Sequence, residues 1–434
     1  MKHRVSIFLI FALILLPGAV LAQELSYDPY AQNFPEIRED SRVENAGKHF
    51  LVYPFEILRW PIDKILVALD EYHVPKKMQW GYDLLDAQGI TPRVSLGRLG
   101  AGVDVDMVRL VHKKGDYPDL IAKGKVYWAH DVVFDVGTEI GLQRIAGDGL
   151  HTSASFQYDD RPEEHFYGIG PDTSRGEGSS YNMERTQVDY NIGYDFSPLM
   201  GVDLKVGYVN VNIKDGEDGG RGVIPRTFAP GSIPGLTGDD LVSVGIVWDR
   251  DSRNLKALST EGGYGRLGLS FVEGVQSSRA RYLRYQAEVS RYLSLGSPRR
   301  VLAVHAYAEH NDEVNDGIVP FHQMAKLGGY GTYPRLGHPL RAYDFNRFFD
   351  ESILLLNVEY RYTIWEYNDF KIDALLSWDE GQVFGEFSDL QLRDFRESYG
   401  LGFRLSLANN ILFSVEMNHG DEGTNFYVKS ATPF

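Results

Sequence analysis

Long stretches in which apolar and polar residues strictly alternate constrain the fold of this chain more than any other feature. From residue 187 to 194 one set of positions is apolar and the other is polar or glycine: Val188, Tyr190, Ile192 and Tyr194 against Gln187, Asp189, Asn191 and Gly193. Similar alternation returns from residue 283 to 290, from 354 to 363 and from 400 to 407. Because successive side chains of a strand point to opposite faces, each stretch predicts a β-strand with one apolar face.

The breaks between these stretches differ in length in a regular way. Those at 197–199, 296–298 and 366–368 are short, and those at 214–238 and 311–350 are long. The connection 252–261 falls on the side of the short turns but is longer than they are. A soluble sandwich would also alternate, but short turns on one side and long loops on the other are typical of membrane barrels. Over residues 90–434 the sequence therefore predicts an all-β fold, an antiparallel transmembrane β-barrel of about sixteen strands.

The first residues of the chain predict export. Lys2 and Arg4 precede a short apolar run, and Val20-Leu21-Ala22 carries the small residues that signal peptidase requires, so residues 1–22 are expected to be a signal peptide. Residues 23–89 are expected to form a periplasmic or lumenal segment with one helix over residues 61–72, whose apolar side chains fall on one face. The sequence contains no cysteine, which excludes a disulfide framework.

Composition and charge agree with an outer-membrane location. The formal net charge is −16, which argues against a basic nucleic-acid-binding surface. The mean hydropathy is only −0.27 despite 26 tyrosines and 23 phenylalanines, because polar residues dilute the apolar ones. A barrel with outer-membrane lipids on one face and a wet lumen on the other has this mixture.

Four segments, taken together, resemble the BamA/TamA outer-membrane barrel superfamily, also called the bacterial surface antigen family. Arg341-Ala342-Tyr343 resembles the Arg-Gly-Phe/Tyr tripeptide at the tip of a long extracellular loop that folds into the lumen in that family. Residues 167–173 resemble its Tyr-Gly-x-Gly motif, residues 248–254 its Asp-x-Arg-Asp turn, and residues 378–384 its aromatic-x-Asp-x-Gly strand motif. The segments occur in the family's order and cover the chain from about residue 166 onward.

The resemblance implies a lock inside the barrel. Alternation in the stretch 372–381 turns Asp379 toward the lumen, and the resemblance places Arg341 against it, with Tyr343 at the same loop tip. The alternative is that Arg341 has no structural role and is solvated in an extracellular loop. Ala342 departs from the family's glycine and would be strained if the turn demanded a positive φ.

The end of the sequence is aromatic. Phe434 resembles the terminal residue of a barrel-closing strand, although Pro433 lacks an N–H and would remove one bond from the ladder. We therefore expect Phe434 to mark the terminus that closes the barrel.

No residue constellation predicts an enzyme, a cofactor site or a metal site. His305 and His310 flank Glu309, but they lie an odd number of positions apart on a predicted strand and so face opposite sides. Serines and histidines lack the local pattern of a nucleophile elbow. A barrel enzyme with dispersed catalytic residues is the weakest of the function hypotheses.

The family resemblance implies that the protein inserts or translocates outer-membrane or secreted client proteins, possessing a partly open seam between its first and last strands. It also implies a periplasmic partner, but residues 23–89 are shorter than one POTRA repeat, so a member without such repeats is expected. The alternative hypothesis is a passive or gated pore that the long loop plugs.

Overall fold

The structure is a computed structural model that describes residues 80, 84, 90–97, 100–112, 119–129, 133–143, 145, 149–216, 222–223, 228, 232–276, 278–331, 338–367, 369–391, 394–407 and 410–434. The expected signal peptide and the expected helix over residues 61–72 lie outside these ranges. No helix in the described part of the chain is long and apolar enough to cross a membrane.

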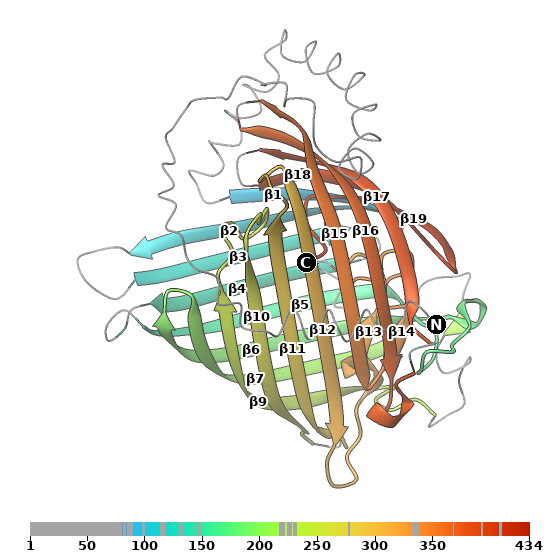
Figure 1. Ribbon diagram of the computed structural model, residues 1–434. Helices are drawn as coiled ribbons and strands as arrows, with labels where there is room; N and C mark the ends of the chain where they lie inside the picture. The colour runs from blue at the N-terminus through green and yellow to red at the C-terminus, as the bar shows by residue number, and fades with distance from the viewer. Residues whose placement is uncertain are drawn as a thin grey trace. The chain divides into compact units, whose positions relative to one another are not determined.

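Sixteen long strands make up the barrel wall in the described ranges (Figure 1). They are β1 (Ile90–Gly97), β2 (Gly100–His112), β3 (Asp119–Ala129), β4 (Val133–Gln143), β5 (Leu150–Phe166), β6 (Ser179–Ser197), β7 (Met200–Asp215), β9 (Gly238–Asp251), β10 (Gly262–Gly274), β11 (Arg281–Ser294), β12 (Arg300–Glu313), β15 (Ser352–Tyr367), β16 (Phe370–Phe384), β17 (Arg396–Leu407), β18 (Asn410–Gly420) and β19 (Gly423–Lys429).

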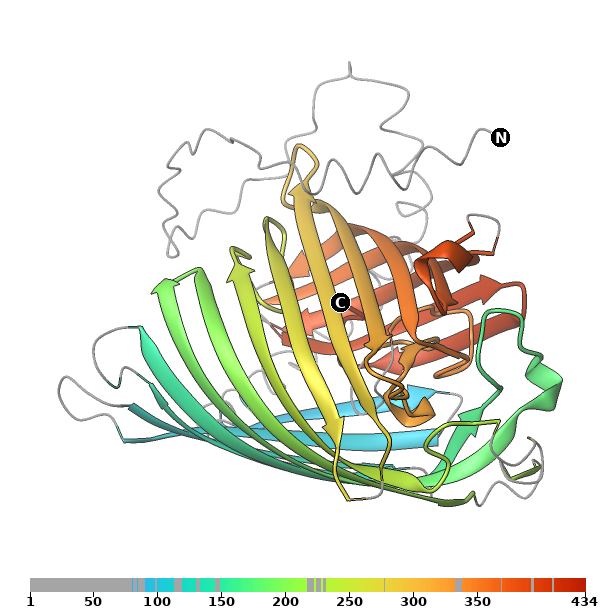
Figure 2. The same cartoon turned by 90° about the horizontal axis from the view of Figure 1, so that it is seen from below.

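Each of these strands pairs antiparallel with the next one along the chain. The two-residue β8 (Gly222–Val223) adds to β6 in parallel, and β13 (Ala325–Leu327) and β14 (Phe348–Asp350) form a separate small sheet. Figure 2 shows the same wall from below, with the strands tilted around a central space. The predicted fold class, an antiparallel barrel of about sixteen strands, is confirmed.

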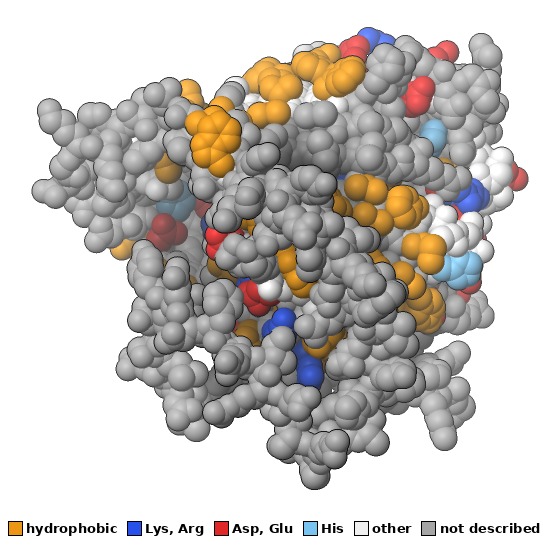
Figure 3. Space-filling view, turned by 90° about the horizontal axis from the view of Figure 1, so that it is seen from above, with side chains coloured by type: hydrophobic (Ala, Val, Ile, Leu, Met, Phe, Trp, Pro, Cys, Tyr) orange, Lys and Arg blue, Asp and Glu red, His pale blue; other side chains and the backbone are white. Residues whose placement is uncertain are grey.

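The alternation predicted from the sequence separates an outer face from a lumen face. On β6, the side chains of Val188, Tyr190, Ile192 and Tyr194 are between 43% and 50% exposed. Gln187 and Asp189, from the other face of the same strand, line a cavity inside the barrel. Figure 3 shows hydrophobic side chains both at the upper edge of the view and in its middle, where charged side chains lie beside them. The exposed apolar belt suits a lipid environment.

The first and last strands are joined by a short seam. β1 and β19 pair only at Ser95–Lys429, Leu96–Val428 and Gly97–Tyr427. In the described ranges, the register gives the residues 423–426 of β19 no partner on β1, and the residues 90–94 of β1 no partner on β19. By comparison, β10 and β11 pair along their whole lengths, from Gly262–Tyr292 to Glu273–Arg281. Among the junctions between the described strands of the wall, the seam therefore has the fewest residue pairs.

The end of the chain differs from the expected closing strand. β19 ends at Lys429, so the closing strand stops before Phe434, and the residues beyond it leave the ladder. The ring of Phe434 stacks on His305 of β12, with ring centroids 5.1 Å apart and an interplanar angle of 8°. Perpendicular views both place the C-terminal end inside the barrel (Figures 1 and 2). Pro433 cannot donate to a ladder, which fits a segment that has left the sheet.

Two truncations separate the closing strand from the segment that follows it. Deleting residues 430–434 should leave every strand paired, so the protein should still reach the outer membrane and migrate faster on gels before boiling than after. Deleting residues 423–434 removes β19 and leaves backbone groups unpaired in the bilayer, at several kcal/mol for each group. Cell fractionation and gel migration compare the two. Normal membrane levels of the longer truncation would contradict the assignment of β19 as the closing strand.

Candidate functional site

The long connection between β12 and β15 turns back into the lumen. This inward segment, residues 314–351, contains the 3-10 helix η2 (Phe321–Gln323) and the β13–β14 pair. Its two limbs approach closely at Gly328, which adopts a φ of +132°. A Cβ at this position would lie 2.3 Å from the carbonyl oxygen of Asp344, so the turn requires glycine.

Arg341 lies at the inner end of the segment and is fully buried. Its Nε and terminal NH2 nitrogens donate to the two carboxylate oxygens of Asp379 on β16, at 2.9 Å and 2.6 Å. Its backbone N–H also donates to Asp379, at 3.1 Å. The remaining terminal nitrogen donates to Glu359 of β15 at 3.0 Å and to Glu416 of β18 at 3.1 Å. One guanidinium thus joins the inward segment to three strands.

The carboxylates around Arg341 have further basic partners in the wall. Glu359 accepts from Arg361 at 2.6 Å and from Arg404 at 3.2 Å. Arg404 also lies 3.8 Å from Glu416. The lumen cluster, as we call it, therefore balances three guanidiniums with three carboxylates: Arg341, Arg361 and Arg404 against Asp379, Glu359 and Glu416.

The lumen cluster is stable although it is buried, because its positive and negative charges are equal in number. A buried ion costs several kcal/mol in lost hydration, which only well-placed opposite charges and hydrogen bonds offset. Burial lowers the pKa of Arg341, but Asp379, Glu416 and Glu359 together raise that pKa above its ordinary value, so the guanidinium remains charged. Its bidentate contact with Asp379 also fixes the direction of the side chain.

Neutral groups complete the contacts of the loop tip. The backbone N–H of Ala342 donates to Ser398 at 3.0 Å, and the Tyr343 carbonyl accepts from Asn425 at 2.8 Å. The Tyr343 ring is buried against Phe348, with centroids 5.5 Å apart. Ala342 does not have a positive φ, so the alanine that replaces the family's glycine is not strained by its backbone. The chain takes its positive φ at Asn346 and at glycines nearby instead.

A second set of contacts holds the outer part of the inward segment. Arg347 donates to Glu422 in the β18–β19 turn at 2.9 Å and to Thr173 in the β5–β6 connection at 2.8 Å. Arg175, from the same connection, donates to Asp344 at 3.0 Å and to the Glu422 carbonyl at 2.8 Å. This outer clamp thus ties the turn before β19 to the far β5–β6 connection through the inward segment.

The segment that resembles the Tyr-Gly-x-Gly motif supplies part of the outer clamp. The Tyr167 ring lies 4.7 Å from the Arg347 guanidinium carbon, and its hydroxyl donates to Asp344 at 3.2 Å. Gly170 donates its backbone N–H to the Phe349 carbonyl at 2.8 Å. The motif therefore positions the inward segment rather than forming a separate site.

Sequence reasoning placed Arg341 beside Asp379, and the structure brings those two together. It places Tyr343 at the same tip and Phe434 elsewhere, against β12. Sequence reasoning missed five members of the site: Glu359, Arg361, Arg404, Glu416 and Tyr330, whose hydroxyl donates to Glu416 at 2.5 Å. Charges at lumen-facing strand positions were a signal for Glu359, Arg361 and Arg404, because a charge facing the lumen beside an inserted loop needs a partner.

The lumen wall beneath the inward segment is apolar. Leu327 and Leu340 of the segment pack in one cluster with Ile353, Leu355 and Val383 of the wall. The strict alternation breaks at this point of the sequence, where residues 353–356 are all apolar. Such a run indicates a strand covered on both faces.

Comparisons with known proteins agree with this architecture. The model of the Omp85 superfamily domain matches residues 138–413. A structure of BamA from Haemophilus ducreyi lacking POTRA domains 1–3 is similar, with a TM-score of 0.56 and 14% sequence identity, covering 79% of this chain and 70% of that one. CdiB from Escherichia coli has a TM-score of 0.50 and 12% identity, covering 79% of this chain and 63% of that one. At these identities the likeness concerns the fold. No curated protein matches the sequence significantly.

Removing the central guanidinium tests how much the lumen cluster stabilises the protein. The substitution Arg341→Ala leaves buried carboxylates without their shared partner and should lower the free energy of unfolding by about 3–5 kcal/mol. Urea denaturation in detergent, followed by gel migration, measures this loss, and limited proteolysis reports release of the segment. Lys214→Ala breaks an ion pair of 2.6 Å that is exposed and should change little. Equal effects of the two substitutions would contradict the lock.

Proposed function

The chain belongs to the Omp85 superfamily, and from this premise we propose that it inserts client proteins into the outer membrane or passes secreted proteins across it. It is an outer-membrane β-barrel. The similar structures are those of BamA and CdiB, and carrying an insertion or secretion role over to this chain is part of the proposal.

The short seam is the observation that carries the proposal. Three residue pairs join β1 to β19, and both strands have edges without a partner across the seam in the described ranges. Exposed backbone N–H and C=O groups form a template on which an incoming strand can pair. A client strand could therefore add to the edge at residues 423–426 without first breaking a full-length ladder.

The locked inward segment favours the seam over the lumen as the route for insertion. Arg341 is fully buried among lumen side chains of β15, β16 and β18, and Leu327 and Leu340 pack on the same side of the wall. A polypeptide that crossed the lumen would have to displace these contacts. Lateral addition at the seam leaves the lumen cluster in place.

The pore hypothesis remains as a second candidate, since a cavity of about 540 Å³ lined by polar and charged side chains lies beside the inward segment. In this candidate the segment is the gate, and opening it would break the outer clamp and the lumen cluster. Planar-bilayer recordings discriminate the two functions: steady conductance that rises in the Arg341→Ala variant supports the pore.

Partners follow from the same proposal. We expect unfolded outer-membrane or secreted proteins as clients, outer-membrane lipids around the apolar belt, and a periplasmic partner that delivers the clients. Residues 23–89, proposed to be periplasmic or lumenal, are the candidate contact for that partner. The lumen lock of Arg341, Tyr343 and Asp379 is proposed to hold the inward segment in place while the seam opens for a client strand.

A disulfide across the seam tests the proposed route. The sequence has no cysteine, so Leu96→Cys with Val428→Cys places the only pair at a seam register position. Oxidation should stop the protein from folding a client barrel into liposomes, because β1 and β19 can no longer separate to admit a client strand between them, and reduction should restore the activity. Gel mobility of the client before and after boiling measures its folding.

A second pair provides the matched control. Leu267→Cys with Ala287→Cys joins register partners in β10 and β11, within the wall and away from the seam. Oxidising this pair should leave client folding unchanged. If the seam disulfide forms completely and client folding continues at the same rate, lateral insertion through this seam is wrong.

A further inference from the structure

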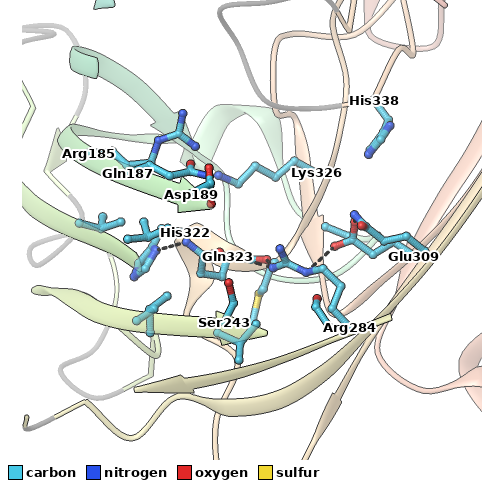
Figure 4. A pocket seen from close by; sticks show the side chains of 18 of the residues that line it. Arg185, Gln187, Asp189, Ser243, Arg284, Glu309, His322, Gln323, Lys326 and His338 are labelled. Atoms are coloured by element: carbon cyan, nitrogen blue, oxygen red, sulfur yellow. Dashed lines mark hydrogen bonds and ion pairs between the residues drawn. The ribbon is translucent and has the colours of Figure 1, made fainter. Parts of the chain in front are cut away.

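A cavity remains between the inward segment and the opposite wall of the barrel. Its volume is about 540 Å³, and Figure 4 shows side chains of both sides turned toward it. The inward segment contributes His322, Gln323, Lys326 and His338, while the wall contributes residues of β6, β7, β9, β10, β11 and β12. A concave site with a few convergent polar groups is the usual form of a ligand pocket.

Lys326 is the unusual residue of this cavity. Its side chain is only 7% exposed, and its ammonium nitrogen lies 5.3 Å from the centre of the Phe349 ring. Figure 4 draws it extending from the inward segment toward Arg185, Gln187 and Asp189 of β6. Within the described part of the chain the ammonium group forms neither a hydrogen bond nor an ion pair. A buried ammonium without a partner is costly, so keeping it charged at this depth requires a counter-ion.

The carboxylates nearest to Lys326 already serve other cations. Asp159 accepts from Arg185 at 2.5 Å and lies 3.4 Å from Arg161, and Glu164 lies 3.8 Å from Arg161. Burial, the largest influence, lowers the pKa of Lys326 to about 8 despite the attraction of Glu164. Lys326 belongs to the inward segment, so its positive charge faces the cavity rather than a strand partner.

The remaining lining adds positive charge and hydrogen-bond donors. Arg266 of β10 lines the same cavity between its register partners Glu288 and Asp249, but no ion pair within 4.0 Å joins it to a described carboxylate. The lining carboxylates have donors of their own: Glu288 contacts His305, Glu309 accepts from Tyr307 and Gln286, and Asp189 accepts from Gln187. Four basic side chains and three carboxylates thus line the cavity, and Arg185 and Arg284 already have ion pairs with Asp159 and Glu309, so Lys326 is left without a partner of its own in the described residues.

We infer that this cavity is a binding site for a small oxyanion from solution, a phosphate or a carboxylate, held by Lys326 and Arg266. Lysine and arginine are the side chains that proteins use to hold phosphate. Their contacts with an anion are stronger where a cavity wall keeps water away. The bound anion would connect the inward segment to the wall opposite the lumen cluster. The inference is independent of the proposed function, because it concerns binding to the purified protein alone.

Binding of inorganic phosphate to the purified full-length protein in detergent tests the site. Isothermal titration at fixed ionic strength, balanced with chloride, should show saturable binding, and phosphate should raise the unfolding temperature. Lys326→Met keeps the apolar stem over Phe349 and removes the charge, so it should weaken phosphate affinity about tenfold. Arg266→Gln should also weaken it, and Lys326→Arg should retain it.

Folding is checked separately for every variant by gel migration before and after boiling. Lys256→Gln changes a lysine outside the cavity lining and should bind phosphate as the natural protein does. Absence of saturable phosphate binding to the natural protein overturns the inference. A folded Lys326→Met variant with unchanged affinity overturns it as well.

Discussion

The need of every backbone N–H and C=O group for a partner within the bilayer is the constraint on which this structure depends. Lipid offers no hydrogen bonds, so strands that cross it must pair on both edges. The wall meets this need by antiparallel pairing of each strand with the next, from β1 to β19. Among the described strands the pairing falls to three residue pairs at the seam alone, and there the residues 423–426 of β19 and 90–94 of β1 have no partner across the junction.

The interior follows a second constraint, which is that buried charges need opposite charges. The lumen cluster satisfies it around Arg341, where three guanidiniums and three carboxylates share one site. The outer clamp then links the β18–β19 turn to the β5–β6 connection, through Arg347 and Arg175. The last strand therefore has contacts with the inward segment, at Asn425 and Tyr427, in addition to its three residue pairs with β1. The inward segment therefore stabilises the end of the wall where the strands share the fewest residue pairs.

The two charged regions of the lumen differ in how their charges are paired. Around Arg341 the charges balance, so the segment is locked without help from a ligand. Around Lys326 the carboxylates are already shared by Arg161 and Arg185, and its ammonium group beside the cavity has no ion pair with a described residue. One region is a finished ion-pair cluster, and the other has the composition of a binding site.

The sequence by itself determined the strands, their facing and the long loop between residues 311 and 350, because period-two alternation and loop length are local properties of the chain, and the family resemblance implied that this loop turns inward. It also indicated that Asp379 faces the lumen, and family resemblance supplied Arg341 as its partner. Only the tertiary structure decided that Glu359, Glu416 and Arg404 complete the cluster, since these residues come from strands far apart in the sequence. It also decided that β19 ends at Lys429 and that Phe434 stacks on His305 across the barrel. By local pattern alone, an aromatic residue at a chain end fits a strand ladder or a lumen pocket equally well. The contacts with residues far away in the sequence, such as His305, decide between the two.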